Sequence, residues 1–260
     1  MKADIEGMKT RTPLEFLLTR RSVPVRFMSA PIPDDDMLRQ LLTAAARVPD
    51  HGKLVPYRFL VLRKPAIDRL AQITHDIGTA QGRDPDKLIK QAAAFKDAPL
   101  TVAVIFTPNL TSPIPLIEQE QTAALTCLSL VNAAEAAGFA GHWLTGWMAR
   151  DADFLRVGFD IAAPQAVTGF VHLGTPAQSP PDRPRPELDA ITRWIDPGSL
   201  QHPALSGYLS GATQVKDDLD RPCILFETTW NLDYFNREHA DIKLHTTPPE
   251  TYLRCDVRHG

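Results

Sequence analysis

The sequence predicts an α+β protein in which helices wrap a single sheet. Two observations favour this class. Helical patterns outnumber strand patterns along residues 12–195, and the strand patterns are few and apolar. No G-x-G-x-x-G motif follows any expected strand, so the residues give no support to a Rossmann dinucleotide site.

The composition is typical of a globular protein with one sizeable core. The chain has 260 residues, 43% of them hydrophobic, with a formal net charge of −3. This balance offers no basic surface for nucleic acid or for an acidic membrane, so we expect neither partner. The apolar stretch at residues 122–147 is interrupted by Asn132, Glu135 and His142, and predicts a buried helix and strand rather than a membrane span. Scattered cysteines without a CxxC pair, and an N-terminus without an apolar signal core, predict a cytoplasmic protein.

Capping residues mark the first helix. Thr12 can cap it, Pro13 suits the first helical position, and Glu15 completes a capping box. The helix should end near Arg21, because Pro24 forces the residue before it out of the helical region.

The segments that follow alternate between helices and strands. Acidic residues at positions 34–36 open a second helix, which stops before Pro49, and a loop covers residues 48–56. We then expect a strand at 57–62, helices at about 65–79 and 84–96, and an unbroken apolar strand at 100–106 that is buried on both faces.

The longest helical pattern covers residues 118–137. It is rich in alanine and apolar nearly all round, as expected of a central helix, and Gly138 ends it. Strands are expected at 140–147 and 166–173, with a short helix at 151–157 between them. A rigid proline-rich segment at 180–186 and a helical turn or two within 187–194 complete the predicted domain.

The composition divides the chain into two parts. Residues 12–195 form the predicted domain, and residues 197–260 form a polar C-terminal extension of unknown role with a strand-like stretch at 223–226. Two interpretations of the extension stay open. Its Cys and His residues could bind a metal, although their spacings match no ligand pattern, or it could be an arm that packs on a partner subunit.

A cluster of arginines follows the first helix. Arg20, Arg21 and Arg26 lie close to Ser22 in the sequence. The planar fork of an arginine matches phosphate or carboxylate, so one interpretation is a phosphate cradle. The other is a helix end whose cations answer the negative end of the helix dipole.

This cluster, with Ala-Arg-Val-Pro-Asp-His at 46–51 and Pro-Tyr-Arg-Phe at 56–59, resembles the FMN-dependent nitroreductase family. Within that family it looks most like the short branch of small NAD(P)H oxidoreductases. The resemblance covers roughly residues 12–195. It implies a nitroreductase-like sandwich with a central, mostly antiparallel sheet, FMN as cofactor, NADH or NADPH as co-substrate, and a homodimer that holds FMN at the subunit interface.

The resemblance assigns cofactor contacts to four segments. In the family an Arg-x-Ser group holds the flavin phosphate and ribityl chain, an arginine and a histidine of the next loop contact FMN, a strand tripeptide runs along the flavin, and a basic residue after the last strand approaches the phosphate. The matching residues are Arg20, Arg21 and Ser22; Arg47 and His51; Trp143, Leu144 and Thr145; and Arg183 and Arg185. The end of the long helix corresponds to a nicotinamide-nucleotide site, with Ala133, Ala134, Glu135, Ala136, Ala137 and Gly138.

Each segment also has a structural interpretation. Asp50 and His51 can cap a loop while Arg47 pairs with a carboxylate, Trp143 can be a core aromatic, and the basic residues after the last strand can belong to a solvated linker. The chain departs from the family pattern at Leu144, where a cation can occur.

The sequence contains no G-x-S-x-G or H-E-x-x-H motif. Flavin chemistry explains this absence, because the flavin ring carries the hydride and the protein supplies orientation and charge. The predicted function is ping-pong transfer of a hydride from NAD(P)H, through FMN, to a small electron-poor acceptor such as a nitroaromatic or a quinone. Two alternatives stay open: another flavin chemistry of the same fold, such as flavin cleavage or dehalogenation, and a non-enzymatic flavin- or ligand-binding module.

Overall fold

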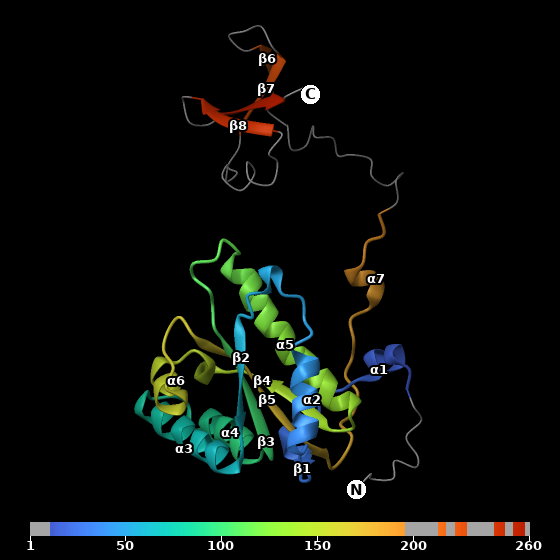
Figure 1. The fold of residues 1–260 in the computed structure, drawn as a ribbon, viewed down its shortest axis with the longest axis vertical. Coiled ribbons are helices and arrows are strands. Elements are labelled where there is room, and N and C mark those ends of the chain that lie inside the picture. The colour runs from blue at the N-terminus through green and yellow to red at the C-terminus, as the bar shows by residue number, and fades with distance from the viewer. Residues whose placement is uncertain (1–10, 196–212, 217–221, 228–241, 248–251, 258–260) are drawn as a thin grey trace. The chain divides into compact units, whose positions relative to one another are not determined.

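The computed structural model describes residues 11–195, 213–216, 222–227, 242–247 and 252–257 (Figure 1). Two compact units make up the chain, Met1–Arg183 and Pro184–Gly260. The domain limits expected from composition, 12–195 and 197–260, stay a proposal.

A five-stranded antiparallel sheet forms the centre of the first unit. Its order is β1-β5-β3-β2, and β4 also pairs with β5. The strands are β1 (Met28–Ser29), β2 (Tyr57–Leu62), β3 (Leu100–Phe106), β4 (Ala140–Leu144) and β5 (Ala166–Pro176). All seven residues of β3 are buried, as its unbroken apolar sequence predicts. The α+β class and the antiparallel sheet are therefore confirmed.

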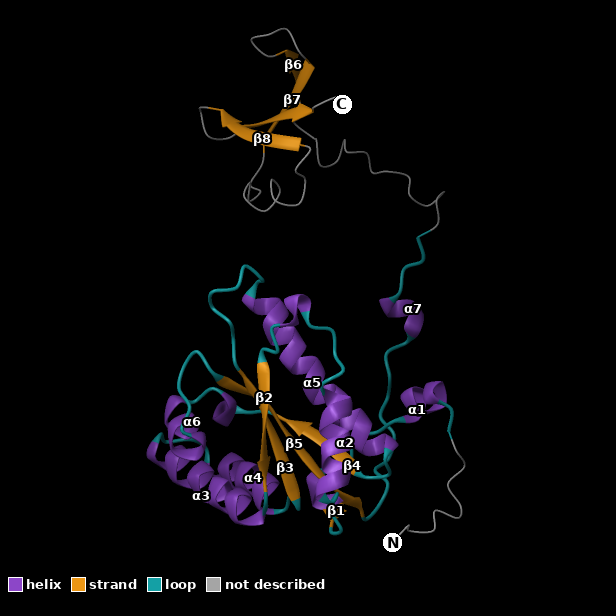
Figure 2. Ribbon diagram, viewed as in Figure 1, coloured by secondary structure: helices purple, strands orange, loops and turns teal. Residues whose placement is uncertain are grey.

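Helices cover both faces of this sheet (Figure 2). They are α2 (Asp35–Ala45) and α5 (Leu116–Ala136) on one face, and α3 (Lys64–Ala80), α4 (Pro85–Lys96) and α6 (Ala152–Phe159) on the other. Side chains alternate along β3: Val102 and Val104 pack with α2 and α5, whereas Ala103 and Ile105 pack with the other three helices. The sheet thus separates two apolar cores.

Local sequence explains where the helices begin. The capping box that Thr12 and Glu15 were expected to form is present at the start of α1 (Pro13–Thr19). The side chains of Asp34, Asp84 and Asp151 cap α2, α4 and α6 in the same way, each by accepting a backbone N–H bond.

Two elements end earlier than the sequence predicts, and both ends bear on the candidate site. α1 ends at Thr19, because the backbone of Arg20 is already extended, with ψ of 144°. β4 ends at Leu144, because the fully extended Gly146 leads directly into the 3-10 helix η3 (Trp147–Ala149). Two further 3-10 helices, η1 (Val25–Phe27) and η2 (His51–Lys53), lie in loops of the same unit.

The second unit contains a short helix and a separate sheet. The helix is α7 (Leu188–Ile191), and the strands are β6 (Thr213–Lys216), β7 (Pro222–Glu227), β8 (Ile242–Thr247) and β9 (Tyr252–Val257). They pair antiparallel in the order β6-β7-β9-β8. The strand-like stretch 223–226 is confirmed as part of β7. Within the described ranges, no group of Cys, His, Asp or Glu is arranged to hold a metal, and no helix is long and apolar enough to cross a membrane.

Candidate functional site

The Arg20–Ser22 segment runs from the end of α1 to the edge of β4. The backbone N–H of Val23 donates to the carbonyl oxygen of Gly141 at 3.2 Å, which places this segment beside β4. The last turn of α1 contains no basic residue, since both arginines follow the helix. Arg20 is the C-cap residue of α1 and Arg21 follows it, so the helix-dipole and phosphate-cradle interpretations both stay open.

Arg20 is largely buried and only partly satisfied. Its Nη2 donates to Oε1 of Glu135 at 3.1 Å and to Oγ of Ser22 at 3.1 Å. The exposed fractions of the Arg20 and Glu135 side chains are 23% and 9%. Nε of Arg20 is buried without a hydrogen-bond partner among the described residues. A guanidinium group has five N–H donors, so this one retains donors for a further oxygen ligand.

Arg21 joins the same region to the chain after β5. Its Nη1 donates to the carbonyl oxygen of Ser22 at 2.9 Å, and its Nε donates to that of Pro181 at 3.3 Å. The pKa of His142 on β4 is lowered by burial first, and then by the charges of Arg21 and Arg183. The positive charges of both guanidinium groups are therefore felt at the same residue of β4, His142.

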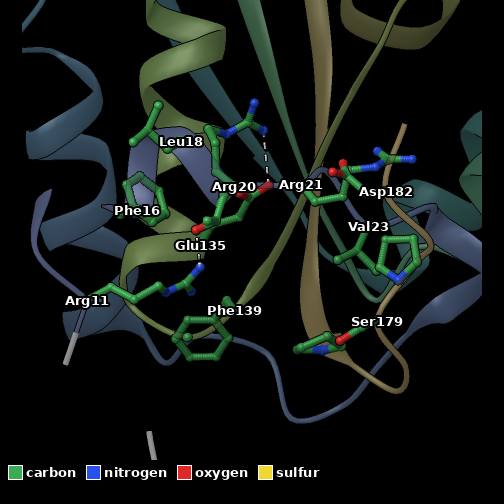
Figure 3. A pocket seen from close by; sticks show the side chains of 14 residues that line it. Arg11, Phe16, Leu18, Arg20, Arg21, Val23, Glu135, Phe139, Ser179 and Asp182 are labelled. Carbon is green, nitrogen blue, oxygen red and sulfur yellow. Dashed lines mark hydrogen bonds and ion pairs between the residues drawn. The ribbon is translucent and has the colours of Figure 1, made fainter. Parts of the chain in front are cut away.

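A cavity of about 600 Å³ opens beside these residues (Figure 3). It is bounded by α1, by the end of α5 and by the chain after β5. The ion pair of Arg20 and Glu135 lies in its wall. Its remaining lining residues are Arg11, Phe16, Leu18, Thr19, Arg21, Val23, Gly138, Phe139, Pro176, Ser179, Pro180 and Asp182.

The second predicted segment, the loop with Arg47 and His51, is exposed and strained. Nδ1 of His51 lies 2.7 Å from Oε2 of Glu118 on α5. Asp50 accepts backbone N–H bonds from Leu54 and Val55, so the loop-capping interpretation holds for Asp50. Val55 has φ of 48°, which is a real outlier for a β-branched residue. Such strain is commonly retained at functional sites.

The long helix α5 separates the two predicted groups. His51 contacts Glu118 in its first turn, whereas Arg20 contacts Glu135 in its last turn. These two glutamates are seventeen residues apart, which corresponds to about 25 Å along the helix axis. Within one chain, the arginine cluster and the His51 loop are therefore not brought together.

The three residues of the strand tripeptide, 143–145, lie in different environments. The indole of Trp143 lies against Gly169, where a Cβ atom would come within 2.0 Å of Nε1, and that nitrogen is buried without a partner among the described residues. Leu144 is partly buried and packs against the core on the α3 side. Thr145 is exposed beyond the strand end.

The end of α5 contributes less to the cavity than its sequence position implies. Only Glu135 and Gly138 of the six residues assigned to nucleotide binding line the cavity. Ala134 is fully buried, and Ala133 packs against the core. Ala136 and Ala137 are exposed. Gly138 has φ of 84°, the left-handed conformation that a glycine adopts readily at a helix end.

Two basic residues, Arg26 and Arg185, do not belong to the Arg20 cluster. Arg26 is exposed, with its guanidinium 4.6 Å from the ring centre of Phe27, so it does not complete the cradle within this chain. Arg185 belongs to the second unit, whereas Arg183 is the last residue of the first.

The ion pair between Arg20 and Glu135 is not predicted from the sequence. A carboxylate at the negative end of a helix was the available signal, since such a group needs a nearby cation.

Comparison with known proteins identifies the family. The nitroreductase family model matches residues 17–175, which is more than half of the chain. The chain belongs to the nitroreductase family. It is 32% identical over 165 residues to YdjA of Escherichia coli K12, a protein provisionally named as an NAD(P)H nitroreductase. That alignment covers 63% of this chain and 87% of YdjA.

Solved structures establish the nitroreductase fold. A Desulfovibrio desulfuricans protein, provisionally named a nitroreductase and solved in complex with FMN, aligns with a TM-score of 0.57 at 22% identity. The alignment covers 72% of this chain and all of that protein. The NADPH:FMN oxidoreductase of Vibrio harveyi, solved with NAD+, aligns with a TM-score of 0.56 at 16% identity, over 76% of this chain and 83% of that one.

Proposed function

We propose that this member of an oxidoreductase family is an FMN-dependent NAD(P)H oxidoreductase. Its hydride acceptor is a small, electron-poor compound of the nitroaromatic or quinone kind, and turnover is ping-pong. The observation that carries the proposal is the incompletely satisfied Arg20, which lies with Arg21 at one cavity. A cytoplasmic location is part of the same proposal.

The residues of the cluster fit a phosphorylated flavin. A phosphate offers several oxygen acceptors, and the buried Nε of Arg20 lacks one. An unmet buried donor costs about 1–3 kcal/mol, so a ligand that meets it gains affinity. Arg21, Ser22 and Arg183 would complete the cradle, and backbone around Leu144 and Thr145 would approach the ring.

The chemistry proposed here requires no acid, base or nucleophile from the chain. When bound, FMN supplies hydride transfer between a nicotinamide and an acceptor. The role of the protein is to bind the phosphate, to place positive charge near the site and to orient the ring. Arg21 and Arg183, whose charges contribute to the lowered pKa of His142, would supply the positive charge.

The separation of the two predicted groups supports a homodimer. Six residues of α5 repeat at alternating intervals of three and four, which places them on one helix face. They are Glu118, Gln121, Leu125, Leu128, Asn132 and Glu135. At the centre of this face, Leu125 and Leu128 have exposed fractions of 41% and 40%.

The positions of these leucines suit a two-fold axis. Leu125 lies seven residues after Glu118, and Leu128 lies seven residues before Glu135. Antiparallel packing of two copies about the leucines would therefore place the first turn of one α5 beside the last turn of the other. The His51 loop of one copy would then meet the Arg20 cluster of its partner, and FMN would lie between the subunits.

The first helix gives independent support for a second copy. Leu14, Leu17 and Leu18 of α1 have exposed fractions of 66%, 58% and 75%, and no residue of α1 is buried. A helix this short gains little stability alone, so an apolar face of this kind is expected to pack on another surface.

An absorption spectrum of the purified protein tests the function. We expect a flavin spectrum, or its appearance after incubation with FMN, that bleaches when NADH or NADPH is added without oxygen. Reoxidation by a nitroaromatic or quinone would then identify the acceptor class. Flavin that binds but is never bleached would favour a non-enzymatic binding module, and no flavin binding would overturn the proposal.

A further inference from the structure

The ion pair of Arg20 and Glu135 places a carboxylate at the proposed phosphate site. A site that only binds phosphate would not need this carboxylate. The guanidinium that is best placed for a phosphate already contacts a carboxylate of the same chain. Arg20 and Glu135 both line the cavity, so any anion that enters meets the two charges together. The carboxylate offsets the positive charge that would attract a phosphate.

Glu135 occupies an unfavourable position for a carboxylate. It lies in the last turn of α5, where the helix dipole is negative, and its side chain is only 9% exposed. Its Oε1 lies 3.1 Å from Nη2 of Arg20. Among the described residues, Arg20 is therefore the ion-pair partner of Glu135.

The contact leaves the arginine available for exchange. Glu135 takes one bond from Nη2, which Ser22 shares, whereas Nε is unmet. This is not the two-bond arrangement in which arginine grips a carboxylate most firmly. A phosphate that displaced Glu135 could bind the Arg20 guanidinium with two parallel bonds, which is the firmer geometry.

We propose that Glu135 is a competing anion for Arg20 that weakens the binding of phosphorylated flavin. This inference rests on the proposed function and assigns Glu135 the part of setting cofactor affinity. FMN must take part of the guanidinium away from Glu135, so the chain binds FMN less tightly than its arginine cluster would otherwise allow. Riboflavin, which lacks the phosphate, does not meet this competition.

The test compares the affinities of FMN and riboflavin, measured by flavin fluorescence quenching. Glu135→Gln keeps the shape of the side chain and removes its charge. We expect it to tighten FMN binding about tenfold, because the phosphate no longer competes with a charged partner of Arg20, and to leave riboflavin binding unchanged. Glu120→Gln is the matched control, since Glu120 lies on the same helix and pairs instead with Arg150. It should leave both affinities unchanged.

A second pair of variants asks whether the effect acts through Arg20. In an Arg20→Ala background, the gain from Glu135→Gln should disappear. An equal gain with and without Arg20 would indicate general repulsion and overturn the proposal. So would FMN binding that is unchanged or weaker in Glu135→Gln, since a carboxylate that only positions Arg20 predicts a loss. If the wild-type chain bound neither flavin, the proposed function would fail, and this inference with it.

Discussion

Arg20 is partly buried and His172 is fully buried, and the two side chains have different polar partners. Nη2 of Arg20 lies 3.1 Å from Oε1 of Glu135, so this side chain has a carboxylate partner. His172 is fully buried in β5, and its Nδ1 shares a hydrogen bond of 2.8 Å with Oγ1 of Thr101. Burial, and then the nearby His142, lower the pKa of His172 to about 3. The ring is therefore neutral in the folded protein at ordinary pH.

The lowered pKa of His172 predicts a loss of stability in acid. The unfolded chain takes up a proton at this residue as pH falls below the ordinary value near 6.5, whereas the folded chain does not until about pH 3. The contribution of His172 to the free energy of unfolding is therefore fully present above pH 6.5. Between there and about pH 3 it falls by about 1.4 kcal/mol per pH unit. Urea unfolding of His172→Gln should show a shallower fall than the wild type between pH 6 and 4. His75→Gln, at an exposed site, should follow the wild type; identical slopes for His172→Gln would contradict the account.

At the scale of elements, the loop around η2 carries the clearest strain. Gly52, Lys53 and Val55 all have positive φ, with values of 69°, 54° and 48°. Glycine tolerates this conformation, but a β-branched side chain does not. The bonds from Leu54 and Val55 to Asp50 hold the loop in place. A rigid loop can present Arg47 and His51 to a cofactor without first being ordered.

Relief of the strain at Val55 should stabilise the protein. Val55→Gly removes the side-chain clash at φ of 48° and is expected to raise the free energy of unfolding by about 1 kcal/mol. Thermal unfolding measures the change. The control is Val61→Gly in β2, also a partly exposed valine, which should destabilise because glycine weakens a strand. A lower unfolding temperature for Val55→Gly would show that the loop is not strained.

Local signals made most elements predictable from the sequence. The capping box at Thr12, the apolar run of β3 and the alanine-rich α5 depend on neighbours in the chain, and all three are confirmed. The same reasoning extended α1 to Arg21 and β4 to 147, since proline and glycine signals locate an end only to within a few residues. The family resemblance, rather than periodicity, supplied the nitroreductase fold.

The candidate site was predictable only in part, because its key contact is distant in sequence. Arg20 and Glu135 were both singled out, but for different ligands, since nothing local pairs residues 115 positions apart. Whether the predicted residues hold FMN stays a proposal. The structure adds that one chain places the Arg20 cluster and the His51 loop at opposite ends of α5.

At the scale of the whole molecule, the proposed flavin site requires two copies of the chain. The face of α5 centred on Leu125 and Leu128 is the proposed contact, and each site would combine the Arg20 cluster of one copy with the His51 loop of the other. A two-fold dimer contains two such sites. Defects in different segments should therefore complement each other between subunits.

The most direct test is such a complementation. One tagged chain carries Arg20→Ala and a differently tagged chain carries Arg47→Ala with His51→Ala, and the mixed dimer is isolated after co-expression. We expect about half of the wild-type FMN occupancy, because one of its two sites is intact. The reciprocal control pairs a chain bearing all three substitutions with an unchanged chain, and this dimer should have no intact site. The opposite pattern, with FMN in the control dimer and none in the mixed one, would mean that each chain builds its site alone and would contradict the account.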